Sequence, residues 1–408
     1  MSTDHLIPVI PLESAVMTRG EGSFVFDRNG KRYTDLTSGQ FCAVLGNSNA
    51  EVLRELARRT AGLVHTSTAI ISDEVLACAQ NLYRISGEMR ASSIILSTGA
   101  EVIEFCLRNA KSIQGKPGVV CFTNGYHGLT LGAQSVTFGG RYTSPHVTNI
   151  YAVTAPDAAW TEDQVATSLE EIDRLFSANN DIAAFLVEPI VSVGGMVFPP
   201  VAWFHAVREL CDKHDVLLVL DECQSGFGRT GDWFAYQTYG FVPDMVAAAK
   251  AIGLGYPVAA ALFRDSLVER VSSLPAHYSS HQNDPFGAAV INTAISYIEA
   301  NDVLSQVKAK GAHFLAALEH LTASNPHLTR PRGEGLMLGV DLYFDGVTNY
   351  RPIYKQLTSM LMERGVILQG TEGGRVLRFL PDFLIDDNDV DQALATLDAV
   401  ISELHTAA

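Results

Sequence analysis

Short apolar runs alternate with amphipathic stretches through most of the chain. The runs include VLLVL at residues 216–220 and MVAAA at residues 245–249, whose length and apolar content are typical of buried strands. Residues 51–64 and 73–86 carry apolar side chains at spacings of three and four, which predicts helices. Because strand-like and helix-like stretches follow one another in turn, we expect an α/β protein with a mostly parallel sheet and helices on both of its faces.

The two ends of the chain show a different pattern. Residues 1–20 contain Pro8 and Pro11 and predict an irregular arm. The alternating segments SFVFD and KRYTDL flank Asn29 and Gly30, which predicts a hairpin with a two-residue type I′ turn. After Asp284 and Pro285 a long apolar helix is expected, followed by strands and a closing helix. The ends therefore predict a second, smaller α/β unit.

Composition and charge narrow the class of protein. The 408 residues are 47% hydrophobic and 18% charged, which favours a globular chain with an extensive core. The formal net charge of −16 argues against nucleic acid or an anionic membrane as a partner. The sequence lacks a long uncharged apolar run and the features of a signal peptide, so we expect a cytoplasmic protein without a membrane span.

The cysteines point to a reducing compartment and give no support for a metal site. None of the six forms a Cys-x-x-Cys pair, so neither zinc binding nor a disulfide framework is expected. They are scattered along the chain and suit small buried side chains: Cys42, Cys78, Cys106, Cys121, Cys211 and Cys223.

Candidate chemistry lies at the ends of two strand-like runs. Asp221 follows VLLVL directly, and Lys250 ends the run that begins at Met245. Ligands of open α/β sheets bind beyond the carboxyl ends of strands. An amine that forms a Schiff base and a carboxylate that pairs with a pyridinium nitrogen are the groups that a pyridoxal phosphate enzyme needs. Taken singly, the acid could be a helix cap and the lysine a solvated charge.

The residues between them resemble a known family. DECQSGFGRTG, followed by PDMVAAAKAIGLGYP, closely resembles the signature of the class III (ω- or ornithine-type) aminotransferases, which are fold-type I pyridoxal phosphate enzymes. The resemblance runs from about residue 22 to the closing helix. It implies an N-terminal arm and hairpin over residues 1–45, a large cofactor-binding domain over 46–285 and a small domain completed by 286–408. It also implies at least a homodimer, or a homotetramer, with the cofactor near the subunit interface.

The resemblance implies a role for each matching residue. Lys250 would hold pyridoxal 5'-phosphate as a Schiff base and then serve as general acid and base, while Asp221 would keep the ring nitrogen protonated. Arg378 would bind the substrate carboxylate, and Gln40 would lie beside the substrate. The phosphate of the cofactor would lie in the turn formed by Thr98, Gly99 and Ala100. The ring would stack on Tyr126, which His127 follows in the chain. The remaining implied contacts are Glu188 on the substrate side, Gln224 on the phenolic oxygen and Ser280 on the phosphate in the partner subunit.

One of these assignments has independent support from the residues. A turn of small residues at 97–100 opens an amphipathic helix, and the first N–H groups of a helix are free to bind an anion. Ser97 or Thr98 could equally be an N-cap. The two interpretations are compatible because a cap and a phosphate cup use the same turn.

The expected function is transfer of an amino group between an amino acid or amine and a 2-oxo acid. A decarboxylation-dependent transaminase of the 2,2-dialkylglycine decarboxylase type is the alternative, because Gln40 and the segment from Ser280 to Pro285 resemble that subgroup. Tyr126 and Val193 count against it, since the decarboxylases carry tryptophan and serine there. An epimerase is a further alternative. A non-catalytic binding protein is disfavoured by the presence of both Lys250 and Asp221.

Overall fold

The computed structural model describes residues 6–7, 9–10, 15–140, 149–274, 277–371 and 373–407. Much of the expected irregular arm lies outside these residues. Where the arm is described, Met17–Glu21 forms strand β1, which pairs antiparallel with β2 (Phe24–Asp27), so regular structure begins earlier than the prolines suggested. Within the described residues, no helix combines the length and the apolar character needed to cross a membrane.

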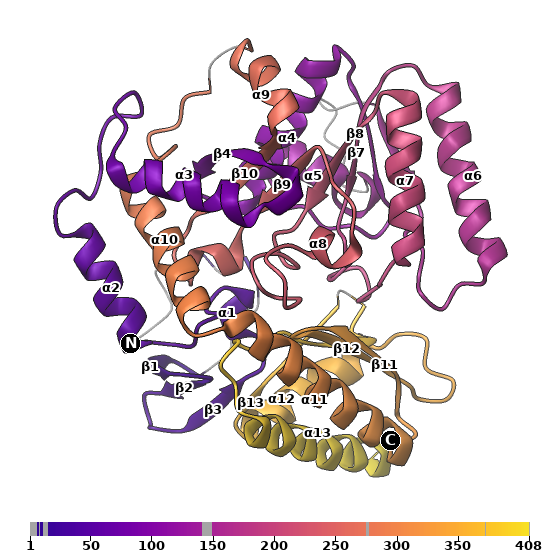
Figure 1. Ribbon diagram of the computed structural model, residues 1–408. Helices are drawn as coiled ribbons and strands as arrows, with labels where there is room; N and C mark the ends of the chain where they lie inside the picture. Colours follow the sequence, from indigo (N-terminus) through magenta and orange to yellow (C-terminus); the bar gives the residue numbers. More distant parts are fainter. Residues whose placement is uncertain are drawn as a thin grey trace.

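A seven-stranded sheet forms the centre of the larger part of the molecule (Figure 1). Its order is β4-β10-β9-β8-β7-β5-β6, and β10 runs antiparallel to both of its neighbours, so the expected mostly parallel sheet is present. Almost all of its central residues are buried, as expected for parallel strands covered on both faces. The strands are β4 (Ala91–Leu96), β5 (Gly118–Phe122), β6 (Ile150–Val153), β7 (Ile182–Val187), β8 (Leu217–Asp221), β9 (Met245–Ala248) and β10 (Ala259–Arg264).

Alternate side chains of the strands enter two separate cores. Leu218 and Leu220 of β8 pack into one core, while Leu217 and Val219 pack into the other. The first core is shared with α3 (Asp73–Ile85), α6 (Glu162–Ala178), α7 (Val201–His214) and α10 (Pro285–Ala300). The second is shared with α4 (Gly99–Gln114), α5 (Leu131–Val136) and α9 (Asp265–Ser272). Helices therefore cover both faces, which holds the carboxyl ends of β8 and β9 in a fixed position.

The smaller part of the molecule combines both ends of the chain (Figure 1). In the sheet β1-β2-β3-β13, strand β3 (Arg32–Asp35) pairs in parallel with β13 (Val366–Ile367). The second small sheet has the order β11-β12-β15-β14, from β11 (Leu328–Glu334), β12 (Met337–Leu342), β14 (Gln369–Gly370) and β15 (Val376–Phe379). The α-helices of the whole molecule that have not yet been given are α1 (Ser38–Phe41), α2 (Ala50–Thr60), α8 (Ala235–Tyr239), α11 (Val303–Ser324), α12 (Arg351–Glu363) and α13 (Asp387–Ala407). The domain boundaries at 45/46 and 285/286 stay predictions.

The expected hairpin is confirmed, but its turn has a different form. β2 pairs antiparallel with β3, with Val25 opposite Tyr33. Gly30 has a φ of 81°, whereas Asn29 is not in the left-handed region that a type I′ turn requires of both central residues. The carboxylate of Asp27 accepts hydrogen bonds from the backbone N–H groups of Asn29 and Lys31, at 2.8 and 3.0 Å, and this favours a connection longer than two residues, over residues 28–31.

Arg229 joins the two parts of the molecule. It follows β8 in the GFGRTG loop and is fully buried. Its guanidinium donates to the backbone carbonyls of Leu336 and Pro381 in the small part and lies 4.7 Å from the ring centroid of Phe383. Burial lowers the pKa of Arg229 to about 9. The glycine-rich motif therefore has a structural role in docking the small part onto the sheet.

Replacing Arg229 with methionine is expected to lower the free energy of unfolding by about 3 kcal/mol, because two buried carbonyl groups lose their donor. Urea unfolding followed by circular dichroism would measure it. Arg364→Met is the control, since Arg364 pairs with the half-exposed Glu403 and its loss should cost under about 1 kcal/mol. Equal losses for the two variants would contradict the docking role.

Candidate active site

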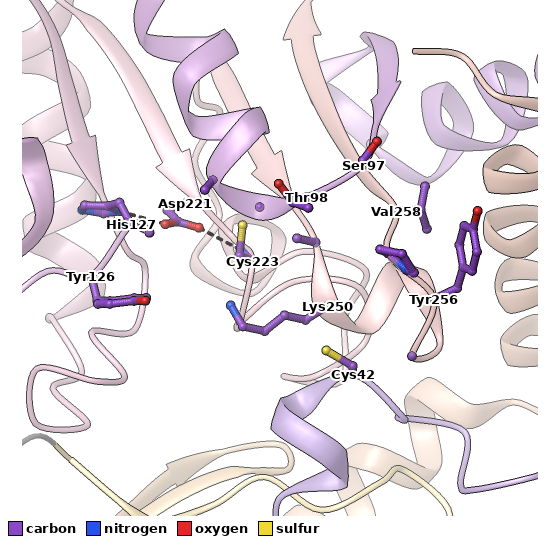
Figure 2. A pocket seen from close by; sticks show the side chains of 16 residues that line it. Cys42, Ser97, Thr98, Tyr126, His127, Asp221, Cys223, Lys250, Tyr256 and Val258 are labelled. Carbon is purple, nitrogen blue, oxygen red and sulfur yellow. Dashed lines mark hydrogen bonds and ion pairs between the residues drawn. The ribbon is translucent and has the colours of Figure 1, made fainter. Parts of the chain in front are cut away.

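A cavity of about 440 Å³ lies where the carboxyl ends of β8 and β9 meet the first turn of α4 (Figure 2). This is the edge of the sheet at which ligands of α/β proteins bind. The cavity brings together seven of the residues named from the sequence: Thr98, Gly99, Ala100, Tyr126, His127, Asp221 and Lys250.

Asp221 is the last residue of β8, and its carboxylate is held on both sides. Oδ2 accepts a hydrogen bond from Nδ1 of His127 at 2.8 Å, and Oδ1 accepts one from the backbone N–H of Cys223 at 3.0 Å (Figure 2). Burial acts to raise the pKa of Asp221, but the hydrogen bond from His127 and the charges of His127 and Lys250 outweigh it, so the pKa lies below its ordinary value. Asp221 is thus a fixed, charged group in a buried site.

The neighbouring acid, Glu222, has the structural role that was considered for Asp221. Its carboxylate accepts hydrogen bonds from the backbone N–H groups of Ala235 and Tyr236, at 2.8 and 3.0 Å, and so caps the start of α8. Burial raises the pKa of Glu222 to about 7. Of two consecutive acids, one therefore stabilises a helix and the other lines the cavity.

Lys250 follows β9 and extends across the cavity toward Tyr126 (Figure 2). Its backbone has a φ of 52°, in the left-handed region that side-chain-bearing residues rarely adopt. Such a conformation costs on the order of 1 kcal/mol or more and is retained where the surrounding structure imposes it. Here the residue opens the short turn Lys250–Gly253, whose other residues are buried, and this directs the partly buried amine into the cavity.

The first turn of α4 supplies backbone donors to the cavity. Oγ1 of Thr98 accepts a hydrogen bond from the backbone N–H of Glu101 at 3.3 Å, so Thr98 is the N-cap. The N–H groups of Gly99 and Ala100 precede the first intrahelical bond and are available to an anion. A side chain at Gly99 would lie 3.3 Å from Sγ of Cys223, so glycine allows the turn to approach β8 closely. The cap and the anion cup thus share one turn, as the sequence suggested.

A chain of hydrogen bonds connects the cavity wall to Arg378. Glu188 accepts from the backbone N–H of Tyr126 at 2.8 Å and from that of Ser192 at 3.3 Å. Nη1 of Arg378, on β15, donates to Oγ of Ser192 at 3.1 Å, and Nε donates to the carbonyl of Gly370 at 3.2 Å. Burial raises the pKa of Glu188 to about 7 and lowers that of Arg378 to about 10. The two parts of the molecule thus place a buried cation behind the Tyr126 side of the cavity.

Three sequence-named residues have other surroundings. Gln224 is buried, and its Oε1 atom has no hydrogen-bond partner among the described residues. Gln40 is exposed and does not line the cavity, although Cys42, two residues later, does. The turn that carries Gln40 is left-handed throughout, with φ between 42° and 70° for Ser38–Phe41. Ser280 is exposed and lines a separate cavity of about 360 Å³ with His65 and residues 66–68.

Some cavity residues escaped sequence reasoning. Cys42 and Cys223 both line the cavity, where only buried small side chains were expected. Tyr256 and Val258 also line it, and they stand inside the GLGYPV segment that the lysine motif had already marked. Their position next to Lys250 was the available signal. For Cys42 the available signal was its place two residues after Gln40, which the resemblance had put beside the substrate.

Comparison with known proteins gives a consistent result. The family model for class-III aminotransferases matches residues 10–401. A LysW-aminoadipate semialdehyde/glutamate semialdehyde transaminase of Sulfurisphaera tokodaii is 33% identical over 380 residues, 92% of each chain. An acetylornithine/succinyldiaminopimelate aminotransferase of Photorhabdus laumondii is 30% identical over 98% of this chain and 96% of its own. The solved (S)-enantioselective omega-transaminase of Thermomicrobium roseum superposes with a TM-score of 0.90 at 27% identity, over 98% of this chain and 97% of its own.

Proposed function

We propose roles for individual residues on the premise that this chain belongs to the class-III aminotransferase family. It is a pyridoxal 5'-phosphate-dependent aminotransferase, which moves an amino group between an amino acid or amine and a 2-oxo acid. The observation that carries the proposal is the single cavity that combines the amine of Lys250, the carboxylate of Asp221 and the first turn of α4.

The residues present fit this cofactor. The N–H groups at the start of α4 suit its phosphate, and the charged carboxylate of Asp221 suits its ring nitrogen. Gln224, whose buried amide oxygen lacks a partner among the described residues, is the proposed contact to the phenolic oxygen through its amide group. Tyr126 is the proposed stacking ring, and Ser280 the proposed phosphate contact of a partner subunit. When bound, the cofactor supplies an electron sink for the electrons left behind on a substrate carbon.

Within that arrangement the protein moves and holds protons. Lys250 is the proposed residue that would bind the cofactor covalently. Its freed amine would take the proton from the Cα of the amino donor, pass it to the cofactor side, and in the second half of the transfer deliver a proton to the Cα of the acceptor. Asp221, held in place by His127, is the proposed carboxylate whose fixed negative charge would keep the ring nitrogen protonated. The buried position of Asp221 excludes water and so strengthens this interaction.

Arg378 is the proposed binding group for the substrate carboxylate. Its planar guanidinium can bind a carboxylate through two hydrogen bonds. Replacing it with methionine is expected to raise KM for α-amino acids by about 10²-fold, equivalent to about 3 kcal/mol, and to leave KM for monoamines unchanged. Steady-state kinetics with paired substrates would measure this. Arg375→Met is the matched control, because Arg375 directly precedes the same strand, β15, and is exposed to solvent. Equal changes of KM in the two variants would contradict the assignment.

Decarboxylation-dependent transamination is the second candidate, favoured by Gln40 and the Ser280–Pro285 segment. The reactions differ in which bond at the substrate Cα stands perpendicular to the cofactor ring. The test is a single-turnover reaction of holoenzyme with 2-aminoisobutyrate, which has no Cα–H, beside a panel of amino acids and amines. Turnover only with Cα–H substrates and without CO₂ is the expected result. Release of CO₂ from 2-aminoisobutyrate would establish the decarboxylase instead.

The same proposal extends to assembly and location. We propose a cytoplasmic homodimer or homotetramer in which the cofactor lies near the subunit interface. Support comes from exposed apolar side chains between α2 and α3, including Leu63, Val64, Ile70 and Ile71, which are each 47–62% exposed in the single chain. Light scattering of the purified holoenzyme tests this, and a monomeric mass at micromolar concentration would contradict it.

A further inference from the structure

Residues 38–41, labelled α1 in Figure 1, form a turn in which every backbone is left-handed. The φ angles are 42° for Ser38, 57° for Gly39, 63° for Gln40 and 70° for Phe41. Only glycine adopts this region without a steric cost, so the other residues of the turn carry strain that surrounding contacts must offset. Strained backbone of this kind is retained where it places a side chain that function needs.

Buried hydrogen bonds hold the turn against the small part of the molecule. The carboxylate of Asp35, which is 4% exposed, accepts a hydrogen bond from the backbone N–H of Gly39 at 2.8 Å. Oγ of Ser38 donates to the backbone carbonyl of Leu380 at 2.8 Å. Leu380 directly follows β15, the strand that carries Arg378. The turn is therefore fixed relative to the strand of the proposed substrate arginine.

The turn places the ring of Phe41 against the guanidinium of Arg378. Cζ of Arg378 lies over the ring, 5.1 Å from its centroid, and both residues are only 5% exposed. A cation over the face of an aromatic ring is attracted by the π electrons of the ring, and the attraction is larger where water is excluded. The left-handed turn thus gives a buried cation an aromatic support.

The other contacts of Arg378 leave one edge of its guanidinium open. Nε donates to the carbonyl of Gly370, and Nη1 gives one of its N–H groups to Oγ of Ser192. Within the part of the chain that the structure describes, Nη2 has no hydrogen-bond acceptor. Glu188, whose charge acts on Arg378, is instead bonded to the backbone N–H groups of Tyr126 and Ser192. The N–H groups of Nη2 and the second one of Nη1 thus remain for the two oxygens of a carboxylate.

We propose that Phe41 is a positioning residue for the reaction, which acts through Arg378. The inference rests on the proposed role of Arg378 in binding the substrate carboxylate. Hydrogen bonds hold the guanidinium at Nε and Nη1, and the ring of Phe41 supports its flat face and so restricts its rotation. The open edge is presented in one orientation before the substrate binds, which lowers the entropy lost on binding.

The test is a double-mutant cycle of Phe41→Leu and Arg378→Met, with KM and kcat measured for the α-amino acid that the wild type uses best. Leucine keeps apolar bulk and bears the same left-handed strain, but it has no π face. We expect Phe41→Leu to raise KM about 10-fold and to leave kcat within about twofold of the wild type. In the Arg378→Met background, Phe41→Leu should cause no further change of KM. Phe41→Tyr keeps the ring and should restore most of the affinity.

Phe24→Leu is the matched control. The ring of Phe24 also lies against an arginine, with Cζ of Arg32 at 4.5 Å from its centroid, but this pair belongs to the hairpin and does not line the cavity. Its KM should equal that of the wild type. Thermal unfolding of each variant separates a general loss of structure, which would lower the midpoint, from a selective change of KM.

Two results would overturn the proposal. Wild-type KM in Phe41→Leu would show that the ring does not support Arg378. An equal rise of KM from Phe41→Leu with and without the Arg378 guanidinium would show that Phe41 acts on the substrate independently of the arginine. Both results leave the proposed function intact. An unchanged KM in Arg378→Met alone, by contrast, would contradict the proposed carboxylate-binding role and remove this inference with it.

Discussion

Replacement of Lys250 with alanine is expected to reduce transamination by at least about 10⁴-fold, because it removes both the covalent attachment of the cofactor and the group that moves the substrate proton. The loss should appear in kcat for every amino donor. Mass spectrometry after borohydride treatment gives a second measurement: the wild type should retain cofactor mass on the peptide that contains Lys250, and the variant should retain none.

Lys250→Arg is the matched control. It keeps a positive charge near Asp221, where the charge of Lys250 contributes to the lowered pKa, but a guanidinium does not serve as an amine nucleophile. We expect the arginine variant to be as inactive as the alanine variant. Substantial activity in Lys250→Arg would show that charge alone suffices, and covalent cofactor in Lys250→Ala would assign the attachment to another lysine.

Replacement of Asp221 with asparagine is expected to lower kcat by about 10³-fold, with cofactor still bound through the phosphate turn and Lys250. Asparagine has nearly the same shape as aspartate, but its neutral amide cannot stabilise a positive charge on the ring nitrogen. In a buried site the interaction between a fixed carboxylate and such a charge is large. Single-turnover kinetics and cofactor content, measured on the same preparation, separate loss of catalysis from loss of binding. An apoprotein preparation would point to a binding role instead.

Asp244→Asn supplies a control at the other end of the same strands. Asp244 is as deeply buried as Asp221, but it precedes β9 and pairs with Arg208 and Arg264, each at 2.7 Å. Its loss should lower the thermal midpoint, because two cations lose their partner, and leave kcat close to that of wild type. A similar fall in kcat in both variants would mean that Asp221 acts through stability rather than through charge at the cavity.

The central part of the fold and of the candidate site could be predicted because its signals are local. A buried strand is visible in VLLVL, and the acid that follows it must stand at the carboxyl edge of the sheet. The phosphate turn is likewise local, since Thr98 caps the helix that begins at Gly99. The resemblance added Arg378, whose burial and contact with Ser192 agree with a place near the cavity.

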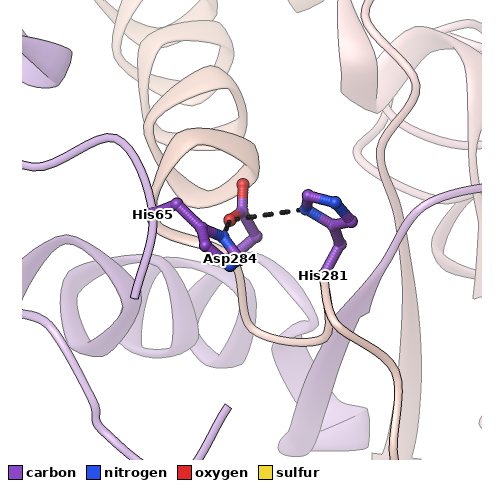
Figure 3. A group of neighbouring side chains, drawn as sticks. All are labelled: His65, His281 and Asp284. Atoms are coloured by element: carbon purple, nitrogen blue, oxygen red, sulfur yellow. Dashed lines mark hydrogen bonds and ion pairs between the residues drawn. The ribbon is translucent and has the colours of Figure 1, made fainter. Parts of the chain in front are cut away.

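The rest depended on contacts between distant residues. The resemblance placed Gln40 beside the substrate, whereas Cys42 is the residue that lines the cavity with Lys250. The left-handed turn at 38–41 that decides between them follows from packing rather than from local preference. The capping role of Glu222 was equally hidden in the sequence, since it depends on where α8 begins. His65 and Asp284 meet across 219 positions of sequence (Figure 3), a separation that no motif bridges.

The pairing of β3 with β13 has a consequence for synthesis of the chain. Residues 32–35 emerge early from the ribosome, yet the strand that completes their sheet lies at residues 366–367. At ordinary rates of translation the hairpin waits on the order of half a minute for that strand. During this interval the edge of β3 is open to other strands, so the newly made N-terminus is the part of the chain with most need of a chaperone.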